Sequence, residues 1–129
     1  MTSLSSSLYT AASFLYIAII PKHVKVGLTL IPQTMKAVPS TEQFALAKAI
    51  IPATWHFVNG YLVTLALLNY KWAKSGGPTT TMEKWIVGVN AIAGVLVGVQ
   101  YLKARLNVAL SVLWLAPGLS IAAGLLQSR

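Results

Sequence analysis

Residues 84–102 read KWIVGVNAIAGVLVGVQYL, and this stretch decides the fold. Its only charged residue is Lys84, at the first position. A transmembrane α-helix needs about 20 predominantly apolar residues to cross a hydrocarbon core of roughly 30 Å. The stretch therefore predicts a helix that crosses a membrane.

Three further apolar stretches, at residues 4–20, 45–70 and 106–126, have a similar character. Together the four predict an all-α integral membrane protein, in which about four transmembrane helices form a small bundle. We expect a single transmembrane domain over residues 1–129. Kinks are expected at Pro21, Pro52 and Pro117, because proline removes one backbone hydrogen bond within a helix.

The composition agrees with a membrane protein and argues against a soluble domain. Apolar residues make up 56% of the chain and charged residues only 9%, whereas a soluble domain has about 25% charged residues. The mean hydropathy is +0.68. A soluble chain of this size could not bury so much apolar surface, and a bilayer removes that difficulty.

The end of the first helix has two interpretations. Pro21 can end the helix, or it can kink a helix that continues to Ile31, since membrane helices tolerate proline when neighbouring groups satisfy the freed carbonyl. Residues 32–39 contain several polar residues between two prolines, and we expect a connector there.

Later helix boundaries carry clearer signals. Ser40 with Gln43, and Thr80 with Glu83, are capping-box patterns that predict helix starts. Residues 75–78 read SGGP and predict a loop between the second and third helices.

No helix breaker separates the third and fourth apolar stretches. One long rod over both stretches is therefore an alternative. We expect a turn near residues 103–107, because a rod of about 50 Å would overshoot the membrane.

The net charge of +8 comes from ten basic residues at the edges of the apolar stretches, not along one face. Nucleic acid is therefore not an expected partner. The positive-inside rule places the more basic set of loops on the cytoplasmic or matrix side and both termini opposite. That set comprises Lys22, Lys25, Lys36, Lys48, Lys103 and Arg105, and the other comprises Lys71, Lys74, Lys84 and Arg129.

Two pairs of basic residues are expected to lie at one membrane face: Lys22 with Lys25, and Lys103 with Arg105. The simpler interpretation is that they set the topology. Alternatively they bind an anionic lipid head group such as that of cardiolipin, as basic pockets between helices do. We expect no other cofactor.

Small residues recur on one face of the third and fourth stretches. At this spacing they let two helix backbones approach closely, which favours association in lipid. The expected packing residues are Ala91, Gly94 and Gly98 on the third stretch, and Ala116, Ser120 and Gly124 on the fourth.

Groups that could carry chemistry are few, since the chain has two glutamates, two histidines, and no cysteine or aspartate. A metal site is not expected, because it needs three or four converging ligands. His56 and Asn59 lie one turn apart in the second stretch, and Asn90 lies in the third. They either hydrogen-bond across helices or form a polar centre in which His56 acts as acid or base and the two amides orient a ligand.

The small size, the near absence of acidic residues and the pI near 10.1 resemble the supernumerary subunits of mitochondrial inner-membrane complexes. This resemblance in class implies a non-catalytic accessory subunit of a respiratory assembly, packed against other membrane subunits and phospholipid. The alternative is a small membrane-embedded enzyme of the isomerase or cyclase type, or a carrier, that acts on a lipophilic substrate.

Overall fold

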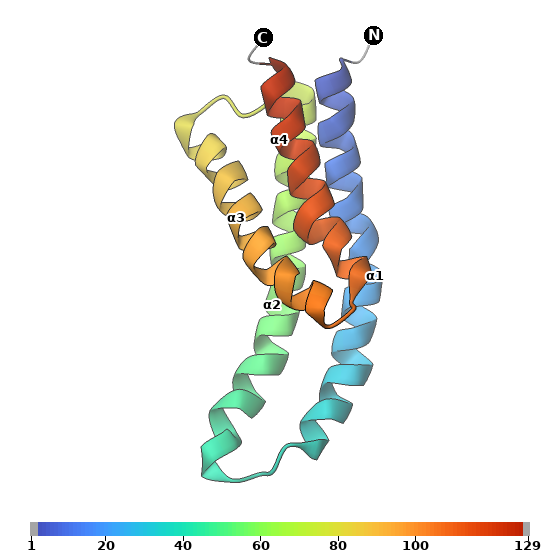
Figure 1. Cartoon of the computed structure of the whole chain (residues 1–129), viewed down its shortest axis with the longest axis vertical. Coiled ribbons are helices and arrows are strands. Elements are labelled where there is room, and N and C mark those ends of the chain that lie inside the picture. The colour runs from blue at the N-terminus through green and yellow to red at the C-terminus, as the bar shows by residue number, and fades with distance from the viewer. Residues whose placement is uncertain (1–2, 128–129) are drawn as a thin grey trace.

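The computed structural model describes residues 3–127, and the regular elements in this range are all helical (Figure 1). They are α1 (Leu4–Ala37), α2 (Glu42–Ser75), α3 (Thr81–Lys103), the 3-10 turn η1 (Asn107–Ala109), the π-helical segment η2 (Ser111–Leu115) and α4 (Ala116–Gln127). Four helical segments, the last covering residues 107–127, are long and apolar enough to cross a membrane. The prediction of an all-α protein with four helices that are long and apolar enough to cross a membrane is confirmed.

α1 and α2 are each a single helix of 34 residues. α1 continues through Pro21 and Pro32, and α2 continues through Pro52. The helix that continues past Pro21 is therefore the correct interpretation, and the connector expected over residues 32–39 covers only residues 38–41. The kinks at Pro21, Pro52 and Pro117 stay predictions.

The start of α2 differs from its predicted form. α2 begins at Glu42 with Thr41 at the N-cap, and no side chain caps it. The capping box predicted at Ser40 is wrong, because the Ser40 hydroxyl instead accepts a hydrogen bond of 2.8 Å from Lys48 Nζ. The same ammonium donates to the Val38 carbonyl at 3.1 Å, so one lysine closes the α1–α2 loop.

The loop between α2 and α3 was correctly predicted. Gly76 has a φ of 82° and Gly77 a φ of 117°, a left-handed conformation that favours glycine. The capping box of α3 is also confirmed. Thr80 Oγ1 accepts from the Glu83 N–H at 3.2 Å, and Glu83 Oε2 accepts from the Thr80 N–H at 3.1 Å.

α3 ends at Lys103 and the chain turns before η1, so the expected turn is confirmed and the single long rod is wrong. Arg105 has a φ of 58° within this turn. Pro117 is the second residue after η2. Because proline has no N–H, the carbonyl of Leu113, four residues earlier, lacks its usual helical partner.

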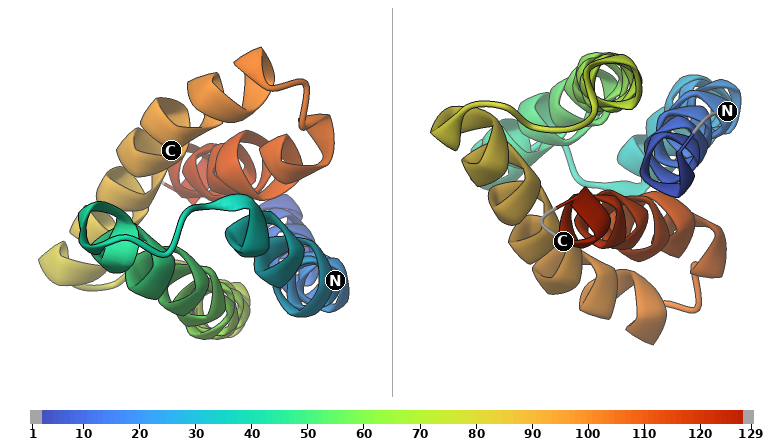
Figure 2. Two further views of the ribbon diagram at one scale, coloured as in Figure 1. Left: turned by 90° about the horizontal axis from the view of Figure 1, so that it is seen from below. Right: turned by 90° about the horizontal axis from the view of Figure 1, so that it is seen from above.

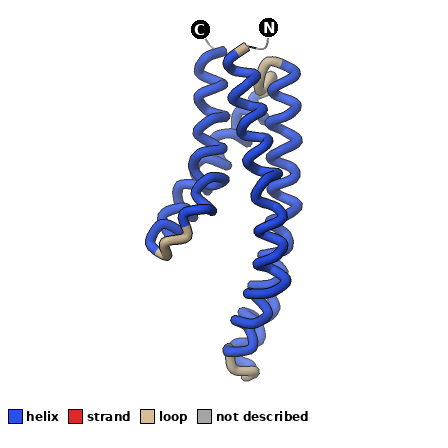
Figure 3. Tube along the Cα trace, turned by 90° about the vertical axis from the view of Figure 1, so that its right-hand side faces the viewer, coloured by secondary structure: helices blue, strands red, loops and turns tan. Residues whose placement is uncertain are grey.

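The α1–α2 hairpin is longer than the α3–α4 hairpin. The turn between α3 and α4 lies level with the middle of α1 and α2 but apart from them, and α1 and α2 continue beyond that level to their loop (Figures 1 and 3). We call residues 26–54 of the α1–α2 hairpin the arm. Both ends of the described chain lie at the opposite end of the bundle (Figure 1), and α4 packs between α1 and α3 in the end views (Figure 2).

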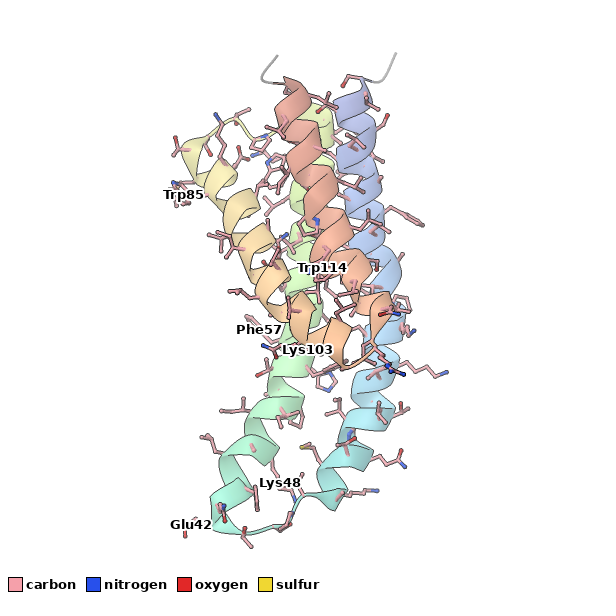
Figure 4. All side chains as sticks on the ribbon, viewed as in Figure 1. Glu42, Lys48, Phe57, Trp85, Lys103 and Trp114 are labelled. Atoms are coloured by element: carbon pink, nitrogen blue, oxygen red, sulfur yellow. The ribbon has the colours of Figure 1, made fainter. Side chains whose placement is uncertain are left out.

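The core of the four-helix part is small. Tyr16 and Leu65 belong to one buried cluster, and Tyr9 and Trp72 belong to a second. Most large apolar side chains instead point outward. Trp85 is 66% exposed and Phe57 is 77% exposed (Figure 4). Such an apolar exterior is suited to contact with lipid, in which burial from water no longer drives helix association.

Candidate functional site

Asn90 connects three helices through one side-chain amide. Its Nδ2 donates to the Tyr16 hydroxyl on α1 at 2.8 Å, and its Oδ1 accepts from the Tyr61 hydroxyl on α2 at 2.9 Å. Tyr16 is almost fully buried. This network holds α3 against the α1–α2 hairpin.

A second buried amide, Asn69, connects α2 with α4. Its Oδ1 accepts a hydrogen bond of 2.6 Å from the Ser120 hydroxyl, and its Nδ2 donates to the Leu65 carbonyl at 2.9 Å. Asn69 is 1% exposed and Ser120 4%. Both polar groups are therefore satisfied inside the bundle.

His23 and Trp55 form a third polar contact, at the base of the arm. The His23 ring and Asn59 Oδ1 are joined at 2.9 Å through Nδ1, and the Trp55 indole N–H donates to the His23 carbonyl at 2.9 Å. The His23 and Trp55 rings stack with centroids 4.2 Å apart. His56 is exposed, and its ring lies near Gly27.

The three residues proposed as a polar centre do not hydrogen-bond to one another within residues 3–127. His56 is exposed, Asn59 is bonded to His23, and Asn90 is bonded to Tyr16 and Tyr61. Asn59 and Asn90 thus form hydrogen bonds to residues of other helices, which is the first of the two alternatives expected from the sequence.

The small residues of α3 face the start of the α4 segment. A Cβ at Gly94 would lie 2.1 Å from the carbonyl oxygen of Leu113, and a Cβ at Gly98 would lie 2.0 Å from Nε1 of Trp114. The Trp114 indole also donates to the Gly94 carbonyl at 3.1 Å. Only glycine allows this approach of α3 to residues 113–114. Ala91, on the same face, is half-buried.

The small residues of α4 face α1 and α2. Ala116 and Ser120 are buried. Gly124 is half-buried, and a Cβ there would lie 3.5 Å from the Tyr9 hydroxyl. The Ser5 hydroxyl donates to the Ala123 carbonyl of α4 at 3.0 Å, so α1 and α4 also share a hydrogen bond.

The four basic residues proposed to bind a head group are all exposed: Lys22, Lys25, Lys103 and Arg105. Lys103 and Arg105 lie at the α3–α4 turn, which is level with the middle of α1 but set apart from it (Figures 1 and 3). They therefore lie at the edge of the four-helix part and not at the tip of the arm.

At the opposite end of the bundle, Glu83 forms an ion pair of 2.6 Å with Lys71. Glu83 Oε2 also accepts hydrogen bonds from the backbone N–H groups of Thr79 and Thr80. This carboxylate precedes the apolar part of α3. Lys71 and the two backbone donors stabilise its charged form.

A crevice with a volume of about 520 Å³ opens between α3 and α4, near the ends that lie beside the α2–α3 loop. We call it the α3–α4 crevice. α3 contributes Lys84, Val87 and Gly88, and α4 contributes residues from Ser120 to Gln127. Tyr9 of α1 also lines it. Neither Tyr9 nor Asn69 was predicted from the sequence as a site residue.

Within residues 3–127, no cluster of three histidine, cysteine, aspartate or glutamate side chains could hold a metal ion. No family model, curated protein or solved structure matches the chain. The function is therefore inferred from the polar contacts, the exposed surfaces and the crevice.

Proposed function

We propose that the protein is a non-catalytic accessory subunit of a larger membrane protein complex. The arm is the observation that carries this proposal. α3 has 23 residues and a length of about 35 Å, which matches the hydrocarbon thickness, whereas the 34 residues of α1 and α2 extend over about 51 Å. With the four-helix part in the bilayer, the arm projects beyond the hydrocarbon.

The arm carries apolar side chains that none of residues 3–127 covers. Leu28 is 65% exposed and Leu30 54% on α1, and Leu46 is 71% exposed and Ile50 50% on α2. Beyond the hydrocarbon these side chains would face water or head groups. Exposed apolar patches at such a place are typical of protein interaction sites, which favours a neighbouring subunit as the partner.

We further propose the mitochondrial inner membrane as the location, and a respiratory assembly as the complex. The net charge of +8 and the exposed basic residues at the edge of the four-helix part suit contact with anionic lipid, including cardiolipin. Subcellular fractionation tests this proposal, and recovery of the protein in another membrane would contradict the location.

Native electrophoresis of mild-detergent extracts, followed by identification of the copurifying proteins, tests the accessory role. The proposal expects the protein in a large complex with a defined set of membrane subunits. The double variant L28A/L46A should leave that complex. The control I92A/L96A changes two side chains on α3 that are 64% and 65% exposed, and it should stay in the complex.

Two results would contradict this role. The first is a protein that migrates alone under conditions that preserve other membrane complexes. The second is that the control I92A/L96A leaves the complex while the arm variant L28A/L46A stays in it. This result would place the contact on α3.

The alternative of a carrier for a lipophilic substrate has one observation in its favour, the α3–α4 crevice. For an enzyme of the isomerase or cyclase type, His56 was the proposed acid or base. Histidine is absent from the described lining of the crevice, so the proposed catalytic residue and the ligand-sized space are separate. The crevice thus favours binding over bond-making.

A further inference from the structure

Tyr9 is a buried polar residue that the packing of the bundle does not explain. Its side chain is 0% exposed, and its hydroxyl has no hydrogen-bond partner among residues 3–127. The ring is held beside Trp72, with centroids 5.9 Å apart. A buried hydroxyl without a partner is unfavourable and needs an explanation.

The Tyr9 hydroxyl lies at the α3–α4 crevice. Tyr9 and Gly124 both line this crevice, and a Cβ at Gly124 would be in ordinary contact with the hydroxyl, at 3.5 Å. A larger side chain at position 124 would cover the hydroxyl. Glycine therefore leaves no side chain between the buried hydroxyl and the crevice on this side.

The crevice has one charged lining residue among those described, a lysine. Lys84 lines it, and the chain has only two acidic side chains, Glu42 and Glu83. Glu83 is engaged by Lys71, and Glu42 lies at the far end of the molecule, in the arm (Figure 4). Neither carboxylate is placed to neutralise Lys84, so an anionic group from outside the chain fits there.

Apolar side chains form much of the remaining wall, beside Ser120 and Gln127. Val87 of α3 and Ile121 of α4 face the crevice. Its volume of about 520 Å³ lies within the range of about 300–1,000 Å³ that is typical of ligand sites. The arrangement of charge, apolar wall and buried hydroxyl suits an amphiphile better than a polar solute.

A smaller cavity of about 10 Å³ continues the crevice inward and shares Val87 and Ser120 with it. Asn69 and Asn90 line this cavity, which has room for about one water molecule. Tyr9 does not line it. A water molecule held there would leave the Tyr9 hydroxyl unpaired.

We propose that the α3–α4 crevice binds an anionic amphiphile. The carboxylate or phosphate of the ligand lies between Lys84 and the Tyr9 hydroxyl, with one oxygen paired with the ammonium and another accepting a hydrogen bond from the hydroxyl. Its chain lies along Val87 and Ile121. A free fatty acid and an anionic phospholipid share this chemistry. The site is independent of the arm and of the accessory role proposed above.

Binding is measured on the full chain in mild detergent by native mass spectrometry, as a titration with three probes. Oleic acid and phosphatidylglycerol represent the two sources of the anionic group, and phosphatidylcholine is the zwitterionic comparison. We expect saturable one-to-one binding of at least one anionic probe, at least tenfold tighter than that of phosphatidylcholine. The anionic probe that binds more tightly identifies whether the ligand is a fatty acid or a phospholipid.

Three variants test the individual contacts. Tyr9→Phe removes only the hydroxyl and should weaken binding about fivefold to tenfold. Lys84→Gln should abolish the preference for anionic probes, whereas the control Lys74→Gln, at the same end of the bundle, should keep it. Gly88→Leu should fill the crevice and prevent binding, because nothing lies within 4 Å of a Cβ at Gly88.

Gly60→Leu is the matched control for Gly88→Leu, since a Cβ at Gly60 also has nothing within 4 Å and Gly60 does not line the crevice. It should bind like the unchanged protein. Equal binding of anionic and zwitterionic probes would overturn the proposal, as would unchanged binding in Tyr9→Phe and Gly88→Leu.

The stability of Tyr9→Phe without lipid supplies a second readout. If the crevice ligand is the partner of the hydroxyl, the lipid-free variant should melt at the same temperature as the unchanged protein or higher. A lower melting temperature together with unchanged binding would assign the hydroxyl to a structural water instead, and would contradict the proposal.

Discussion

Single polar residues connect the helices of this bundle, and Asn90 connects the largest number. Its amide donates to one tyrosine and accepts from another, on two different helices. Apolar contact alone gives helices little reason to associate in lipid, because lipid tails are as apolar as leucine. The amide therefore supplies both attraction and register between α3 and the α1–α2 hairpin.

Asn90→Ala should destabilise the bundle by about 1 kcal/mol, because interhelical hydrogen bonds in membranes contribute about 0.6 kcal/mol each and two are lost. Unfolding in mixed micelles with increasing denaturing detergent measures this change. Gln100→Ala removes an exposed amide from the same helix and should leave the midpoint unchanged. Equal effects of the two substitutions would refute the role assigned to Asn90.

Gly94→Ala should destabilise the protein by about 2 kcal/mol, within the range for overpacking a close contact. The added methyl would meet the carbonyl of Leu113, which belongs to the backbone and cannot rotate away. The thermal midpoint in detergent is the measurement. Gly88→Ala, on the same helix with nothing within 4 Å of the new methyl, should have an unchanged or slightly higher midpoint.

The sequence showed which residues are polar and small, but not how they pair. By sequence alone, Trp72 and Tyr61 are typical of an aromatic belt at head-group depth. Trp72 is instead 1% exposed, and Tyr61 is bonded to Asn90. Tyrosine and tryptophan have both apolar surface and a polar atom, so the same residue suits a bilayer interface or an interior network. Only the packing of the neighbouring helices decides between them.

At the scale of the helices, local signals predicted some boundaries and missed others. The capping box at Thr80 and the glycine loop act within a few residues and were recognised. The box at Ser40 failed because Lys48, eight positions later, occupies that hydroxyl. The length of α1 was left open because Pro21 and its basic neighbours are typical both of a helix end and of a helix that leaves the membrane.

Thr80→Ala should destabilise α3 by about 1 kcal/mol, the typical contribution of an N-cap side chain. The substitution removes the hydroxyl that accepts from the Glu83 N–H. Hydrogen exchange of the first turn of α3 should become faster, and this local measurement separates fraying from global unfolding. Thr81→Ala, next to the cap, is the control, and an equal acceleration there would contradict the capping role.

At the scale of the whole molecule, the arrangement of the helices fixes which loops share a side of the membrane. Both ends of the described chain and the α2–α3 loop lie at one end of the bundle (Figure 1). The α3–α4 turn and the arm lie toward the other end. The count of apolar stretches predicted this up-and-down order, whereas the projecting arm required the relative lengths of the two hairpins.

The central claim is that four helices cross the membrane. The chain has no cysteine, so single cysteines at Met82, Thr41 and Leu106 can be labelled with a membrane-impermeant maleimide in sealed vesicles. Four crossings predict that Thr41→Cys and Leu106→Cys react from the same side, and that Met82→Cys reacts only from the other. Reaction of all three from one side would contradict the account.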